Sequence, residues 1–143
     1  MKKISFLALL SIFVALVSAQ TEPEEYVKVF LSEVGKANFK SAIELMPLSD
    51  KMKEDTASMK NLLANLGKNA DELGKYYGYE LISKEEISPS LIHYTYFIKY
   101  QDSPQRILFV FYKPGEKWQL NRISLTGSTP QRQAANRQQR FRF

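Results

Sequence analysis

The feature that most constrains the fold is a stretch rich in aromatic and β-branched residues between Tyr76 and Trp118. It holds 11 of the 18 aromatic residues of the chain. Turn signals divide it, together with the residues that follow, into YELISKEEI (79–87), LIHYTYFIKY (91–100), RILFVFYK (106–113) and WQLNRISL (118–125). Because short connections join antiparallel neighbours, these segments predict a four-stranded antiparallel meander.

The pattern inside the segments predicts a curved sheet. Residues 91–100 alternate between two faces, and residues 106–113 are apolar on both. In residues 118–125 the alternation changes phase near Asn121-Arg122, as it does at a β-bulge, and bulges bend sheets. One face therefore needs helices over it, and the other needs a partner subunit or forms the rim of a pocket. The pattern leaves open which face is which.

Three helical segments precede the strands. Apolar residues at intervals of three and four mark the first, which ends near Gly35. The second stops at Pro47, and the third runs from Ser49 to Leu66, with Gly67 as the left-handed residue past its end. The pair Pro114-Gly115 predicts a type II turn between the last two strands. Together these segments predict an α+β fold with three N-terminal helices packed on a curved four-stranded antiparallel sheet.

The first nineteen residues predict export. A basic start precedes an apolar run from Ile4 to Val17, and small residues lead up to Ala19. We therefore expect residues 1–19 to be a signal peptide cleaved after Ala19, with the periplasm or the outside of the cell as the destination. The chain has no cysteine, so neither a lipid anchor on cysteine nor a disulfide is expected.

Residues 20–126 are expected to form a single domain, and residues 127–143 differ from it in composition. This Gln/Arg-rich end holds four arginines and no acidic residue. It has too few large apolar groups to offset the entropy of ordering, so it is predicted to be a disordered tail. As an alternative function, its arginines would bind an anionic polymer or a membrane surface weakly. Nucleic acid is not an expected partner.

The order of the segments resembles a known superfamily. Three leading helices followed by YELISKEEI, LIHYTYFIKY and ILFVFYKPGEKWQLNRISL are similar to the cone-shaped nuclear-transport-factor-2-like (NTF2-like) and ketosteroid-isomerase-like domains. They look most like small exported bacterial members of unassigned function. The resemblance covers Glu24 to Thr126, and its most specific part is the hairpin FYKPGEKWQL. It implies a fold and not an activity, because one fold hosts many functions.

The residue types that several chemistries need are missing from the sequence. With one histidine, His93, and no cysteine, neither a metal site nor a cofactor is expected. The isomerase chemistry of the resembled superfamily uses aspartates that line the cone, yet Asp102 is the only aspartate from 79 to 125 and it lies in a turn signal. If the chain were an isomerase- or hydrolase-like enzyme using the cone, His93, Tyr96 or Arg122 would act as acid, base or anion anchor.

The sequence therefore favours an exported, non-catalytic binding or interaction module. Such a module would hold a small apolar ligand or form a homodimer through the outer face of its sheet, with no stable membrane anchor after cleavage. The candidate pocket rim combines residues of the first helix and of the strands: Tyr26, Phe30, Tyr96, Phe109 and Trp118. The same residues would serve equally well as ordinary hydrophobic core.

Overall fold

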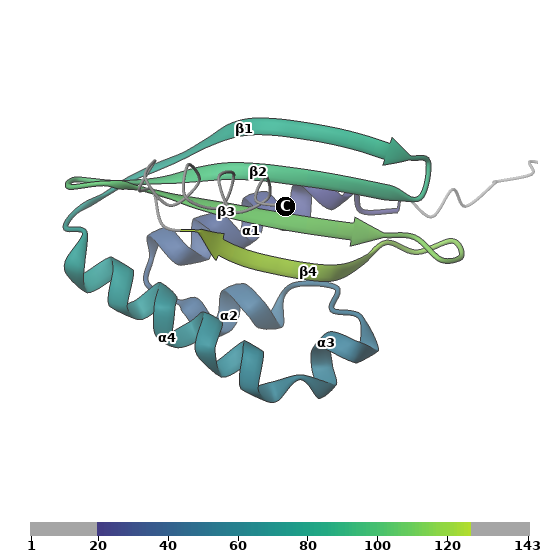
Figure 1. Ribbon diagram of the computed structural model, residues 1–143, viewed down its shortest axis with the longest axis horizontal. Helices are drawn as coiled ribbons and strands as arrows, with labels where there is room; N and C mark the ends of the chain where they lie inside the picture. The colour runs from purple at the N-terminus through teal and green to yellow at the C-terminus, as the bar shows by residue number, and fades with distance from the viewer. Residues whose placement is uncertain (1–19, 127–143) are drawn as a thin grey trace, which may run out of the picture.

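The computed structural model describes residues 20–126 (Figure 1). The predicted signal peptide and the predicted tail lie outside the described residues. The helices are α1 (Pro23–Gly35), α2 (Phe39–Glu44), α3 (Asp50–Glu54) and α4 (Thr56–Glu72). The strands are β1 (Tyr76–Ser88), β2 (Leu91–Tyr100), β3 (Pro104–Tyr112) and β4 (Gln119–Thr126), and they pair antiparallel in the order β1-β2-β3-β4. The predicted α+β fold with an antiparallel meander is confirmed.

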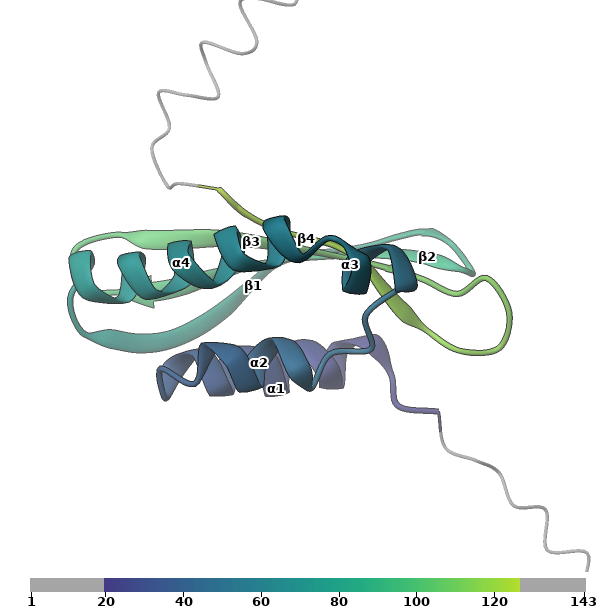
Figure 2. The ribbon, with the colours of Figure 1, turned by 90° about the horizontal axis from the view of Figure 1, so that it is seen from below.

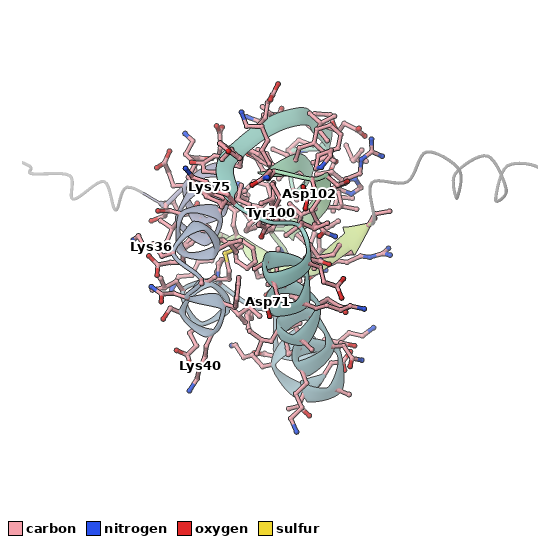
Figure 3. The ribbon with its side chains drawn as sticks, turned by 90° about the vertical axis from the view of Figure 1, so that its left-hand side faces the viewer. Lys36, Lys40, Asp71, Lys75, Tyr100 and Asp102 are labelled. Atoms are coloured by element: carbon pink, nitrogen blue, oxygen red, sulfur yellow. The ribbon has the colours of Figure 1, made fainter. Side chains whose placement is uncertain are left out.

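The helices cover one face and one edge of the sheet. α1 and α2 form a layer beneath the sheet, whereas α3 and α4 lie beside β4 at the level of the sheet (Figure 2). The chain between α2 and α3 pairs with β4, because the N–H of Leu120 donates to the Pro47 carbonyl at 2.7 Å. At the C-terminal end of α4, the N–H of Asp102 in the β2–β3 turn donates to the Leu73 carbonyl at 3.0 Å (Figure 3).

The predicted third helix is in fact two helices. The carboxylate of Asp55 accepts the N–H of Ser58 at 3.0 Å and so caps a new helix, α4. The hydroxyl of Ser49 accepts the N–H of Met52 at 3.3 Å and caps α3 in the same way. The chain therefore turns at Asp55, although its apolar residues continue at helical spacing. Within residues 20–126, no helix has the length and apolar character required to cross a membrane.

Neither glycine that the sequence predicts to be left-handed takes that conformation. α4 continues through Gly67 to Glu72, and the left-handed residue past its end is Gly74, with a φ of 78°. Gly115 also lacks a positive φ, so residues 113–118 do not form the predicted type II turn. A longer loop, which needs no left-handed residue, replaces the tight turn.

The hydrophobic core fills the space between the sheet and α1. On the sheet side it is built from alternate residues of β2 and β3, which are all buried: Ile92, Tyr94, Tyr96, Ile98, Tyr100, Ile107, Phe109 and Phe111. From α1, Val27, Phe30 and Leu31 are fully buried against it. The structure thus decides which sheet face the helices cover.

The opposite side of the sheet, which we call the outer face, is not covered by any of the helices α1 to α4 (Figure 2). At its centre lie partly exposed side chains of β2 and β3: Leu91, His93, Phe97, Leu108 and Val110. The predicted phase change is confirmed as a bulge, since Val110 pairs with Arg122 and Phe111 with Leu120, leaving Asn121 as the extra residue. Arg122 therefore shares the outer face with Val110.

Candidate functional site

The five residues predicted to form a pocket rim lie in the core or against it. Phe30 and Phe109 are 0% exposed and Tyr96 is 3% exposed. The rings of Phe30 and Phe109 meet edge to face, with their centroids 5.2 Å apart. Tyr26 and Trp118 are partly buried against the same cluster. These five side chains therefore help to fill the space between α1 and the sheet.

The buried tyrosines keep their protons at neutral pH. Burial is the main cause that raises the pKa of Tyr94 to about 12, and the negative charge of Glu24 adds to it. Burial likewise raises the pKa of Tyr96. These hydroxyls can donate hydrogen bonds, but they are not poised to act as bases.

His93 lies on the outer face and away from the core. Its partners across the sheet are Glu85 on β1 and Val110 on β3, and Arg122 follows in the same row on β4. His93 and Arg122 are thus two strands apart, which corresponds to about 10 Å between their backbones. Among residues 20–126, no group of histidine, cysteine, aspartate and glutamate side chains is arranged to hold a metal ion.

A cavity of about 700 Å³ lies between β4 and the two helices beside it. We call it the β4 cavity. α3 and the first turn of α4 contribute Asp50, Lys51 and Asp55, and the strands contribute Tyr112 and Arg122. None of the five predicted pocket residues lines it, and neither does His93. Of the candidate site residues named from the sequence, only Arg122, the proposed acid, base or anion anchor, lines this cavity.

The carboxylates of the β4 cavity have hydrogen-bonding partners, whereas its cation Lys51 acts on Asp55 only through its charge. Asp50 accepts from the ammonium of Lys53 at 3.1 Å. Hydrogen bonds from the hydroxyl and then the N–H of Ser58 lower the pKa of Asp55. No ion pair joins Lys51 or Arg122 to an acidic group among residues 20–126. The cavity can therefore offer positive charge to a ligand.

The apolar part of the lining comes from three residues that are distant in sequence. Met52 of α3 is 7% exposed, Met59 of α4 is partly buried, and Ile123 of β4 pairs with the buried Phe109. Only the turn at Asp55 brings both methionines to the β4 edge. The sequence signal for that turn was Asp55, the capping residue of α4. The helical spacing of the apolar residues on both sides of Asp55 hid this signal.

The chain was compared with known proteins. No protein-family model and no curated protein matches it. Among solved structures it is similar to a Campylobacter jejuni protein that is provisionally named an NTF2-like transpeptidase, with a TM-score of 0.55 and 18% sequence identity over 71% of this chain and 99% of that chain. At this identity the likeness shows the fold and not an activity. With α1 and α2 beneath a curved antiparallel meander, this chain has the NTF2-like fold.

Proposed function

We propose that this chain is an exported, non-catalytic binding module that holds a small ligand in the β4 cavity. The observation that carries the proposal is the guanidinium of Arg122, which forms no ion pair within residues 20–126 and lies in the lining of a cavity of about 700 Å³. Ligand sites in proteins commonly have volumes of about 300–1,000 Å³, with a few polar groups that fix the ligand's orientation. Export rests on the composition of residues 1–19.

The packing of the cone supports this location for the ligand. The side chains that would have to line a pocket between α1 and the sheet, Phe30, Tyr96 and Phe109, are buried against one another. A ligand there would have to displace core side chains, which is costly. In contrast, the β4 cavity exists without any rearrangement.

The positions of the titratable groups support a role without catalysis. The name of the Campylobacter protein refers to a transpeptidase, an enzyme whose reaction requires an activated nucleophile. The serines of the β4 cavity, Ser49, Ser58 and Ser124, would need a base, but His93 does not line this cavity. The carboxylate of Asp55 caps α4, and Asp50 pairs with Lys53.

The proposal can be tested by native mass spectrometry on residues 20–143 purified from a bacterial periplasm. We expect a discrete extra mass that disappears on denaturation. Ser124→Trp would fill the cavity, so this variant should lose the extra mass. Thr126→Trp is the matched control, since Thr126 lies two residues further along β4 and does not line the cavity. An extra mass that is absent from the wild type, or that persists in Ser124→Trp, would contradict the proposal.

A second candidate function is self-association through the outer face. Its centre is apolar, with Leu108 and Val110 partly exposed on β3. Its edges carry opposite charge, with Glu85 and Glu80 on β1 and Arg122 on β4, and Glu80 also pairs with Lys99 of β2 at 3.8 Å. A two-fold axis along the strands would place β1 of one copy over β4 of the other, so that acidic groups meet a basic one. An apolar centre with a complementary charged rim is typical of a protein interface.

Light scattering after gel filtration tests this second candidate. We expect Leu108→Asp to convert a dimer into a monomer, because it places a charge at the apolar centre of the interface. Val29→Asp on α1 is the control, since Val29 is an exposed apolar residue on the far side of the molecule. A wild-type chain that is monomeric at micromolar concentration, or a Leu108→Asp variant that remains dimeric, would exclude this use of the outer face.

A further inference from the structure

We infer that the β4 cavity takes a small amphipathic carboxylate, whose carboxylate binds Arg122 and whose apolar body lies against Met52, Met59 and Ile123. This inference rests on the proposed function and adds the chemical class of the ligand. It draws on three features of the cavity: the state of its charged groups, its apolar lining, and the bulge that positions Arg122.

The charges favour a monoanion. Arg122 has no ion pair with an acidic group among the described residues, and Lys51 acts on Asp55 through its charge without forming an ion pair, so each can pair with an acidic group of a ligand. Asp50 and Asp55 lie in the same lining, and each has a hydrogen-bonding partner; hydrogen bonds from Ser58 lower the pKa of Asp55. A dianion such as phosphate would meet stronger repulsion from these two groups than a carboxylate would. The planar guanidinium of Arg122 also matches a carboxylate, to which it can donate two parallel hydrogen bonds.

The apolar lining requires more than a bare anion. Met52 and Met59 are flexible, polarisable side chains that adapt to the shape of an apolar group. Tyr112, which is 37% exposed, adds an aromatic side chain at the same cavity. A fully hydrophilic anion would leave these surfaces in contact with water. An alkyl or aromatic body attached to the carboxylate would cover them.

The charged part and the apolar part of the site meet at β4, next to its bulge. Arg122 pairs with Val110 on the outer face, while the next residue, Ile123, pairs with the buried Phe109. The extra residue, Asn121, shifts the alternation so that Leu120 also lies with the core. Bulges commonly re-aim a side chain next to a functional site. Arg122 and Ile123 are consecutive residues of β4 and both line the cavity, so this edge strand supplies it with a cation and an apolar residue.

The inference can be tested with 3-phenylpropionate and its neutral isostere 3-phenylpropionamide. Each compound is titrated into ¹⁵N-labelled residues 20–143, and the backbone amide shifts are followed by NMR. We expect the acid to shift the amides of residues 119–124 and 50–59, and to bind at least about tenfold more tightly than the amide. Arg122→Gln should remove this preference, whereas Arg106→Gln should keep it. Arg106 is the matched control because it lies over Phe97 and does not line the cavity.

The outcomes separate this inference from the proposed function. If acid and amide bind equally at the cavity, or if Arg122→Gln retains the preference for the acid, the carboxylate class is wrong and the binding module remains. If neither compound shifts the cavity amides, the amphipathic carboxylate is also excluded. The extra mass and its loss in Ser124→Trp then still decide whether the cavity holds a ligand of another class.

Discussion

Replacing Phe109 with alanine is expected to lower the free energy of unfolding by about 3–5 kcal/mol. Phe109 is fully buried on β3, and its ring meets Phe30 of α1 edge to face at 5.2 Å. The truncation removes the apolar contacts of a whole ring and leaves a cavity between α1 and the sheet that rigid strands cannot close. Urea denaturation of residues 20–143, followed by circular dichroism, measures the change.

The matched control for this prediction is Phe97→Ala. Phe97 is the same residue type in the same sheet, but it lies partly exposed on the outer face, where Arg106 covers its ring at 5.8 Å. We expect its loss to cost about 1 kcal/mol, because part of the ring is already in contact with water and Arg106, not the core, covers it. If Phe109→Ala cost no more than Phe97→Ala, the space between α1 and the sheet would be loosely filled. That result would favour the predicted pocket between α1 and the sheet, whose rim includes Tyr26, Phe30 and Phe109.

The strands were predictable because their signals are local. The turn signals on both sides of LIHYTYFIKY predicted the bounds of β2 that the structure has, Leu91 to Tyr100. The phase change at Asn121 likewise marked the bulge, because an inserted residue must reverse the alternation on one side of it. Both features are properties of consecutive residues, so no knowledge of the rest of the fold was needed.

The helical half was less predictable because its signals compete. From Ser49 to Leu66 the apolar spacing favoured a single helix, while Asp55 favoured a new start. The structure shows that the cap decided, since Asp55 begins α4. Gly67 raised the opposite difficulty: a glycine inside a helix costs about 1 kcal/mol, yet the packing of Leu62 and Leu66 carries α4 past it.

The candidate site could be predicted only in part. The sequence named Arg122 as an acid, base or anion anchor of the cone, and the structure places it in the lining of the β4 cavity. The rest of the cavity depends on two segments, 49–59 and 119–124, that are far apart in sequence. They meet because the chain before α3 pairs with Leu120 along the β4 edge. No local pattern encodes that pairing.

Gly35→Ala is expected to destabilise the protein by about 1–3 kcal/mol, although alanine is the better helix former. Gly35 is the last residue of α1, and a Cβ atom there would lie 2.5 Å from Cε1 of Tyr76. Tyr76 cannot move aside without loss. Its hydroxyl donates to the Leu31 carbonyl at 3.3 Å, and its ring packs edge-on against Tyr100 at 6.0 Å. Thermal and urea denaturation measure the difference.

Gly67→Ala supplies a control of opposite sign. Gly67 lies inside α4, and outside its own helix a Cβ atom there would meet only Cε2 of Phe39, at 4.0 Å. This variant should therefore gain about 0.5–1 kcal/mol, as helix propensity alone predicts. If both variants were stabilised, the close contact at Gly35 would be relieved at no cost, and Tyr76 would not be fixed against α1.

A double-mutant cycle isolates the contact itself. Tyr76→Ala removes the ring that the new methyl group would meet, so Gly35→Ala should cost little or nothing in that background. The coupling between the two positions should amount to about 1–2 kcal/mol, comparable with other pairs in direct contact. If the two effects simply add, the cost of Gly35→Ala comes from the end of α1 and not from Tyr76. If they couple, the closeness of α1 to the first residue of β1 is what requires a glycine at position 35.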